Sequence, residues 1–326
     1  MAKTLRIGTR DSQLAVWQAT LVQGLLKEAG IASELVYIKS EGDIDTITPL
    51  YALGVQGIFT KTLDAALLNH RIDIAVHSMK DVPTQLAQGI IQAAVLKRAS
   101  YKDIFVYKEE KDLVALENIN GQWSTVNPKE TLTTHHLPFT IATSSIRRIA
   151  QWLNRYPDHK IENLRGNVNT RLRKVEENNW NGAIFAAAGL ERIQLRPKKA
   201  IDLDWMLPAP AQGAIMVVCR KEDDFAFEAS QSFNDTNTAL CTKIERDFLH
   251  TLMGGCSTPI SALATVIDGK VVFKGNICSK DGKDKIDIER EVVLEDAEHF
   301  GIRAANEFLK DSLAQQIMAG IRHAKK

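Results

Sequence analysis

The chain contains a short apolar strand that ends in a dense group of polar side chains. Residues 71–83 read RIDIAVHSMKDVP, and Ile72, Ile74 and Val76 supply most of the apolar part. Such a run is typical of a strand in a parallel sheet that is covered on both faces. Ligands of open α/β sheets bind beyond the carboxyl ends of the strands. Asp81, which follows this strand, is therefore our first candidate for catalysis.

Two interpretations stay open for Asp81 and for His77. Val82 and Pro83 prevent a helix from continuing across Asp81, which places it in a turn. Asp81 is therefore either catalytic or a structural turn aspartate. His77 is either a general base or a packed histidine, and we favour the second. The pair His135 and His136 lies in an irregular stretch and is expected to be solvated loop.

The first 40 residues predict a βαβ unit, which implies a parallel sheet. A strand is expected at 5–7, and a turn follows in which Asp11 or Ser12 is fit to cap a helix. Apolar residues at helical spacing then continue to Gly30, and the next strand is expected at 35–38.

A second unit with the same order of elements begins near Phe139. A strand is expected at 140–142, followed by the turn Thr143-Ser144-Ser145 and a helix to about Asn154. In both units the strand runs to a threonine, and a serine-bearing turn starts the helix. Two such units facing each other would present two helix N-termini, with free N–H groups, to one cleft that favours anions.

The rest of the chain predicts a returning strand and a third domain. Residues 214–219 form a strand that is suited to return to the first sheet, and an α+β pattern with a strong hairpin signal at Asp268-Gly269 starts near Asp235. We therefore expect an α/β protein with two doubly wound domains and a C-terminal α+β domain. The expected boundaries are 1–105 with 214–232 for domain 1, 106–213 for domain 2 and 233–326 for domain 3.

Composition limits the partners of the chain. Its 326 residues carry 41 Lys plus Arg against 40 Asp plus Glu, a net charge of +1, so no global field attracts nucleic acid or a membrane. There is no secretory signal and no apolar run of transmembrane length, which predicts a cytoplasmic protein. The four cysteines make no C-x-x-C pair, so no metal site is expected. Cys219 and Cys278 are expected to be buried thiols.

Arginines recur at the predicted strand ends and first helical turns. A surface role is open to each of them alone, but together they suit a ligand with many carboxylates. They are Arg10, Arg147, Arg148, Arg165, Arg171 and Arg192.

Cys256 stands apart from the other cysteines because it lies between Gly254-Gly255 and Ser257-Thr258-Pro259, which predicts a loop. It is either a small buried hydrophobe or a thiol that something must reach. The two glycines favour the accessible thiol.

The motifs HSMKDVP, TSSIRR, LRGNVNTRL, AAAGLER, LPAPAQGA and GGCSTPI occur in this order. With them the chain resembles the porphobilinogen deaminase, or hydroxymethylbilane synthase, family from Leu5 to at least Ile260. The resemblance implies two periplasmic-binding-protein-like (type II) α/β domains and a third α+β domain. It also implies a dipyrromethane cofactor, made from two substrate molecules and held by a thioether to Cys256.

The same resemblance implies a transferase of haem biosynthesis. Four porphobilinogen molecules lose ammonia and join head to tail into linear hydroxymethylbilane, with Asp81 as the catalytic carboxylate. We also expect a cytoplasmic monomer that uses neither metal, nucleic acid nor membrane. The residues implied to bind the carboxylates of cofactor and substrate are Arg10, Ser12, Ser78, Lys80, Ser144, Ser145, Arg147, Arg148, Arg165, Arg171 and Arg192.

Two features depart from the family pattern. Gln56 stands where the family commonly has a lysine, and the segment 107–138 looks longer than usual. A two-lobed anion-binding or sensor protein is the alternative to the enzyme, but it needs neither a tethering thiol nor a lone cleft carboxylate. A cysteine-nucleophile hydrolase would require a histidine paired with Cys256.

Overall fold

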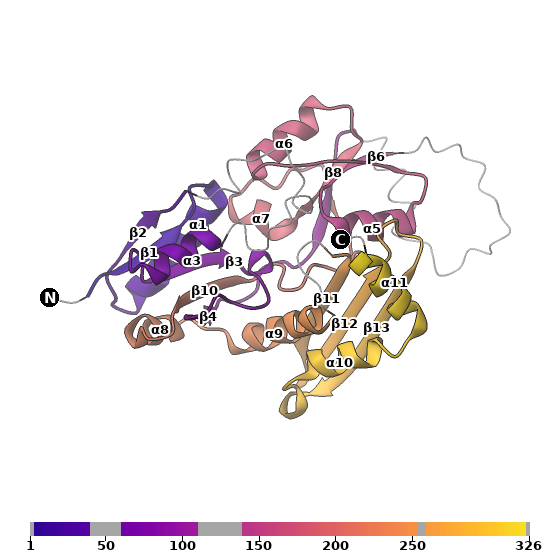
Figure 1. Cartoon of the computed structure of the whole chain (residues 1–326). Helices are drawn as coiled ribbons and strands as arrows, with labels where there is room; N and C mark the ends of the chain where they lie inside the picture. The colour runs from indigo at the N-terminus through magenta and orange to yellow at the C-terminus, as the bar shows by residue number, and fades with distance from the viewer. Residues whose placement is uncertain (1–2, 40–59, 110–138, 253–257, 324–326) are drawn as a thin grey trace.

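The structure is a computed structural model that describes residues 3–39, 60–109, 139–252 and 258–323. Within these ranges the chain forms three sheets, each with helices packed on it (Figure 1). The first two sheets have five strands each, and the third has three.

The first sheet is mixed. In spatial order its strands are β2 (Ser33–Tyr37), β1 (Leu5–Thr9), β3 (Ile74–Ser78), β10 (Ile215–Arg220) and β4 (Ile90–Val95). β1 pairs parallel with β2 and β3, whereas β10 pairs antiparallel with β3 and β4. The predicted return of the chain to the first sheet is thus confirmed.

Helices cover both faces of this sheet. They are α1 (Gln13–Glu28), α3 (Lys61–Leu68) and α8 (Asp224–Gln231). Successive residues of β3 belong to two different apolar clusters: Ile74 and Val76 pack with α1 and α8, and Ala75 packs with α3. Because both faces of β3 are buried, the strand needs apolar residues on each side, which explains its sequence.

The second sheet repeats the strand pattern of the first. Its strands in order are β7 (Lys160–Glu162), β6 (Thr140–Ala142), β8 (Gly182–Ala186), β5 (Asp103–Tyr107) and β9 (Ala200–Asp202). β6 pairs parallel with β7 and β8, and β5 pairs antiparallel with β8 and β9. Its helices are α5 (Ile146–Arg155), α6 (Val168–Glu177) and α7 (Ala187–Arg192). The chain crosses between the two sheets after β4 and again after β9.

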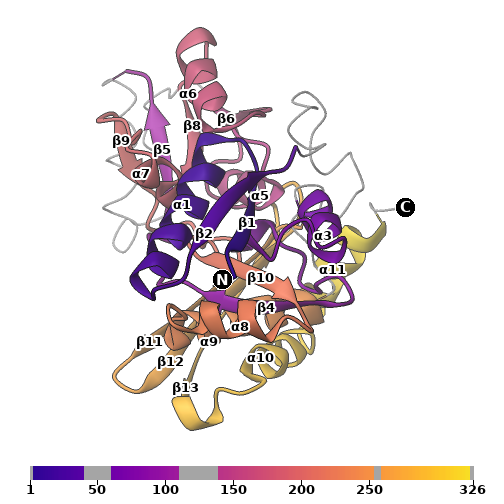
Figure 2. The same ribbon diagram turned by 90° about the vertical axis from the view of Figure 1, so that its left-hand side faces the viewer.

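The third sheet is an antiparallel meander of β11 (Ile260–Ile267), β12 (Lys270–Cys278) and β13 (Lys285–Val293). The predicted hairpin is confirmed, because Asp268 and Gly269 join β11 to β12 with positive φ angles. Helices α9 (Thr236–Thr251), α10 (Phe300–Phe308) and α11 (Ser312–His323) pack on this sheet around Phe248 and Phe273. In both views α1, α6 and β12 lie in separate parts of the molecule (Figures 1 and 2).

The expected α/β class with a third α+β part is confirmed, but several elements differ from the prediction. The sequence favours a turn at Ala188-Gly189-Leu190 and one helical tail from Asp296 to about Ile321. Residues 188–190 instead belong to α7, and the tail is divided by a turn at 309–311 into α10 and α11. The sequence reasoning missed β4, β5, β9 and α8. β4, β5 and β9 are short strands whose pairing partners are distant in the chain, and α8 is a helix of eight residues, so local periodicity does not reveal them. The expected burial of Cys219 and Cys278 is confirmed.

No helix of the described residues is long and apolar enough to cross a membrane.

Candidate active site

A cavity of about 690 Å³ lies where the strands of the first two sheets end. Its lining includes Arg10 after β1, Ser78 at the end of β3, Thr143 after β6 and Ala186 at the end of β8. The first turns of α1 and α5 also contribute residues to the lining. The predicted meeting of two helix N-termini at one cleft is therefore confirmed.

The predicted carboxylate-binding residues and Asp81 all line this one cavity. They are Arg10, Ser12, Ser78, Lys80, Asp81, Ser144, Ser145, Arg147, Arg148, Arg165, Arg171 and Arg192. Cys256, Gln56 and the pair His135-His136 lie outside the described residues. Leu249 and Thr258, which precede and follow Cys256 in the chain, are part of the lining.

The charged part of the lining is strongly cationic. Among the described residues that line the cavity, seven are lysine or arginine and two are acidic, Asp11 and Asp81. The description of Asp81 as a lone cleft carboxylate was therefore wrong. The first turn of α1, which carries no acidic residue, starts two residues after Asp11.

Asp81 ends a single 3₁₀ turn, Met79–Asp81, that follows β3 directly. Met79 is buried, whereas Asp81 is exposed and lines the cavity. The segment is held from behind by Arg246 of α9, which donates hydrogen bonds to the carbonyl oxygens of Val82 (2.9 Å) and Pro83 (2.6 Å). Burial lowers the pKa of Arg246 to about 10, so it is cationic at neutral pH. This anchor fixes the backbone that carries Asp81.

Lys80 precedes Asp81 in the same turn, and its side chain contacts Gln212. Its Nζ donates to Oε1 of Gln212 (3.3 Å), a residue of the crossing between β9 and β10. Burial lowers the pKa of Lys80 to about 8, while the negative charge of Asp81 opposes this shift. Lys80 therefore changes its charge within reach of neutral pH.

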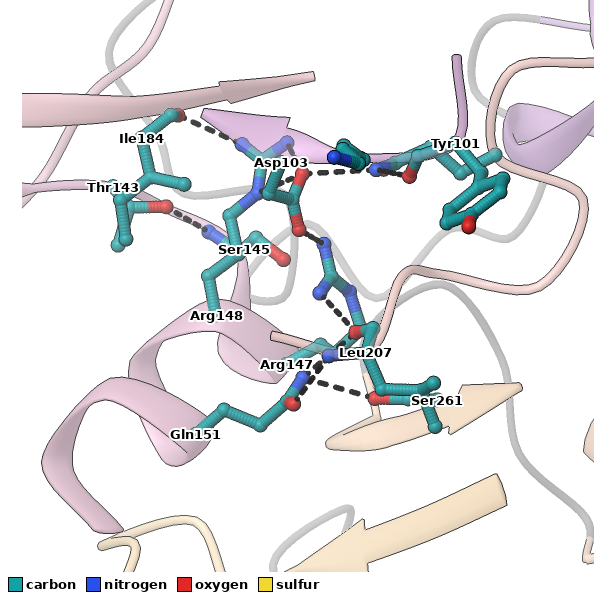
Figure 3. A network of polar contacts seen from close by, with 12 residues as sticks. Tyr101, Asp103, Thr143, Ser145, Arg147, Arg148, Gln151, Ile184, Leu207 and Ser261 are labelled. Carbon is teal, nitrogen blue, oxygen red and sulfur yellow. Dashed lines mark hydrogen bonds and ion pairs between the residues drawn. The ribbon is translucent and has the colours of Figure 1, made fainter. Parts of the chain in front are cut away.

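Arg147 and Arg148, in the first turn of α5, converge on Asp103 at the start of β5 (Figure 3). Arg147 Nη2 donates to Oδ2 (2.6 Å), and Arg148 Nη2 donates to Oδ1 (2.7 Å). Both arginines also reach carbonyl oxygens, Arg147 that of Leu207 (2.8 Å) and Arg148 that of Ile184 (2.9 Å). These cations are held in place by protein groups, so their positions are fixed before any ligand arrives.

Two further arginines of the lining are tied to the backbone. Arg171 Nε donates to the carbonyl of Gly166 (2.7 Å), and Arg192 Nη2 donates to that of Gly213 (2.7 Å). Burial lowers the pKa of each to about 10, so both are charged at neutral pH. The Arg192 guanidinium also lies over the ring of Trp17, 5.9 Å from its centroid.

The serines of the lining have different local roles. Ser12 caps α1, because its Oγ accepts from the backbone N–H of Ala15 (3.4 Å). Ser78 Oγ accepts from Gln18 Nε2 (2.9 Å), and Ser144 Oγ donates to the carbonyl of Leu164 (2.7 Å). Ser145 begins α5 without a side-chain cap hydrogen bond.

His77 is buried, which confirms the prediction of a packed histidine. Burial lowers its pKa to about 4, and the positive charge of Arg10 acts in the same direction. Its Nε2 is buried and has no hydrogen-bond partner among the described residues. At neutral pH the ring is uncharged.

Sequence reasoning missed three residues that organise the site: Asp103, Gln212 and Arg246. Gln212 belongs to the motif LPAPAQGA, but the motif does not reveal which residues Gln212 contacts. Asp103 and Arg246 had no local signal, because their partners are 44 or more residues away.

Comparison with known proteins identifies the chain. Residues 5–228 match the family described as "Porphobilinogen deaminase, dipyromethane cofactor binding domain", and residues 239–310 match "Porphobilinogen deaminase, C-terminal domain". The chain belongs to the porphobilinogen deaminase family. It is a transferase of tetrapyrrole biosynthesis that polymerises porphobilinogen and uses a dipyrromethane cofactor.

Similar proteins cover nearly the whole chain. The porphobilinogen deaminase of Chlorobium phaeobacteroides (strain BS1) is 36% identical over 330 residues, which cover 99% of this chain and 99% of that protein. That of Syntrophotalea carbinolica (strain DSM 2380 / NBRC 103641 / GraBd1) is 37% identical over 324 residues, with 98% and 96% covered.

Among solved structures, the methionine-binding protein MetQ is similar with a TM-score of 0.42 and 13% identity, covering 72% of this chain and 92% of that one. The VFT2 domain of Bordetella pertussis BvgS, crystallised as a double mutant, has a TM-score of 0.38 and 13% identity, with 71% and 85% covered.

Proposed function

We propose that Asp81 is the catalytic carboxylate of this deaminase and that the arginine-rich cavity binds the carboxylates of cofactor and substrate. The observation that carries the proposal is the position of Asp81: an exposed carboxylate on an anchored turn, inside a cavity whose other charged groups are mostly cations. Such a carboxylate is fitted to hold the pyrrole N–H of porphobilinogen. It also stabilises the positive charge that develops as ammonia leaves.

The cations divide into two groups by their contacts. Arg147 and Arg148 share Asp103, so part of their charge is already balanced within the protein. Arg171 and Arg192 donate to carbonyl oxygens, and Arg192 also lies over the ring of Trp17; these contacts do not balance their positive charge. We propose that these two bind substrate carboxylates most directly, together with Arg10 and the other predicted groups.

The donor set fits the dipyrromethane cofactor. Each of its pyrroles carries an acetate and a propionate, and seven basic residues of the described lining can meet several carboxylates at once. The residues that would hold it are Arg10, Ser12, Ser78, Lys80, Ser144, Ser145, Arg147, Arg148, Arg165, Arg171 and Arg192. When bound, the group supplies the pyrrole end to which substrate units are added.

We further propose Cys256 as the attachment point of the cofactor. Its motif, GGCSTPI, matches the family pattern, and Leu249 and Thr258 of the cavity lining lie on either side of it in the sequence. A covalent tether keeps each addition local, at a high effective concentration. We also propose a cytoplasmic monomer. The net charge of +1 supports the part of this proposal that excludes nucleic acid and membranes as partners.

Asp81→Asn tests the catalytic role. The side chain is exposed, so we expect the variant to fold as the wild type does and to lose at least about 100-fold in the rate of porphobilinogen consumption. Asp268→Asn in the β11–β12 turn is the matched control, because asparagine also tolerates its left-handed backbone, and it should retain full activity. A near-normal rate for Asp81→Asn would refute the role of Asp81.

A further inference from the structure

Gln212 connects Lys80 to a carboxylate that lies outside the cavity lining. Its Nε2 donates to the carbonyl of Tyr101 (2.8 Å) and to Oδ1 of Asp103 (2.9 Å). Both partners accept only, so the amide nitrogen must face them and the amide oxygen must face Lys80. The orientation of Gln212, and with it the acceptor offered to Lys80 Nζ, is thus set by Asp103 and Tyr101.

Asp103 is fully buried and is ionised by its surroundings. Oδ1 accepts from Gln212 and from Arg148, and Oδ2 accepts from Arg147. The two guanidinium groups hold the pKa of this carboxyl well below its usual range, against the opposing effect of burial. A permanent negative charge therefore lies behind the cavity wall, between α5 and the turn that carries Lys80.

Charges of both signs act on the ammonium group of Lys80. Asp81 on its own turn and Asp103 on β5 favour its ammonium form, while Arg147 and Arg148 on α5 and its burial disfavour it. Without a balancing carboxylate, the two arginines would lower the pKa of Lys80 further and favour its uncharged form. Asp103 is the group that neutralises them.

We propose that Asp103 is a positioning residue of the reaction: through Gln212, and by balancing Arg147 and Arg148, it holds Lys80 charged and aligned beside Asp81. This inference rests on the function proposed above and adds a residue that neither lines the cavity nor belongs to the predicted site. Its consequence is that Lys80 keeps its charge near neutral pH only while Asp103 is ionised.

The test is the ionisation of Lys80 itself. Competitive labelling of amines with acetic anhydride, followed by mass spectrometry of the Lys80 peptide, gives its titration midpoint in the full-length holoenzyme. In Asp103→Asn we expect the midpoint to fall by about one pH unit, so that the uncharged fraction of Lys80 at pH 7, and with it the labelling, rises roughly fivefold. Removal of the charge should also make the loss of kcat larger at pH 8 than at pH 6.

Asp202→Asn is the matched control in the same sheet. Asp202 pairs with Lys102 and Arg196 and raises the pKa of Lys102. This variant should leave the Lys80 midpoint unchanged and lower that of Lys102, which also shows that the labelling detects a lost carboxylate.

Gln212→Met keeps the test open if Asp103→Asn fails to fold. It preserves the bulk of the side chain and leaves the Asp103–arginine bonds intact, and it should lower the Lys80 midpoint by removing its acceptor. An unchanged midpoint in a folded variant, or an equal loss of kcat at all pH values, would overturn the proposal. Labelling of Lys80 does not depend on turnover. If the Lys80 midpoint shifts in Asp103→Asn while Asp81→Asn remains fully active, the proposed role of Asp81 is refuted and the effect of Asp103 on Lys80 stands.

Discussion

Glu245 of α9 joins the two crossings between the first two sheets to the third sheet. Its Oε1 accepts from Arg98 Nη1 (2.5 Å) and from the backbone N–H of Ala264 in β11 (2.8 Å). Its Oε2 accepts from Arg98 Nη2 (3.0 Å) and from the backbone N–H of Ala211 (2.6 Å). Arg98 lies in the first crossing and Ala211 in the second, so the carboxylate fastens both crossings to the third sheet.

Glu245→Gln removes this junction with little change in volume. All four groups that meet the carboxylate are donors, so the amide nitrogen of glutamine faces two donors whichever way it turns. Two hydrogen bonds are lost, and Arg98 is left without a carboxylate partner. Both side chains are largely buried, with exposed fractions of 11% for Arg98 and 0% for Glu245. Breaking a buried pair by removing one partner costs about 3–5 kcal/mol, and we expect the free energy of unfolding to fall by that amount.

Urea unfolding, followed by circular dichroism and by tryptophan fluorescence, measures the change. The two signals must coincide before a single free energy is assigned. The control is Glu307→Gln, which breaks the exposed ion pair with Arg290 and should leave the urea concentration at the midpoint of unfolding unchanged. A loss below about 1 kcal/mol for Glu245→Gln would contradict the buried-pair reasoning.

The remaining predictions concern His77 and Cys256. The folded pKa of His77, about 4, lies below its unfolded value, so the unfolded chain takes up the proton first and stability is lost as the pH falls from about 6.5 towards 4. His77→Gln should therefore lower the difference in unfolding free energy between pH 7 and pH 5 by about 2 kcal/mol in urea titrations, and an unchanged difference would show that His77 is not the group responsible. Cys256→Ser should fold but carry no covalent cofactor, which mass spectrometry of the purified variant checks; a variant that still carries the group would place the attachment elsewhere.

Much of the site was predictable because its residues follow strand ends. In a doubly wound sheet the carboxyl ends of parallel strands meet at one edge, so Arg10 and Ser78 had to come together once the strands of the first sheet were recognised. Ser144 follows a strand of the second sheet, and it meets them because the two units face each other across one cavity. The flanking motifs also located Asp81 on a short turn, since Val82-Pro83 ends the 3₁₀ segment.

The partners of these residues were not predictable from local patterns. Asp103 begins a strand whose neighbours, β8 and β9, come far later in the chain, and nothing in its own sequence marks it as the partner of two arginines. Arg246 contacts the Asp81 segment across more than 160 residues. Hydrophobic periodicity predicts a helix from Thr238 to Leu252, close to the observed α9, but it does not show which buried charge the helix brings to a distant loop.

The intact mass of the denatured protein shows whether this deaminase carries its cofactor on Cys256. We expect an excess equal to two linked porphobilinogen units less their ammonia, located on the peptide that contains Cys256. An unmodified mass that persists after incubation with porphobilinogen, or an excess located on another peptide, would contradict it.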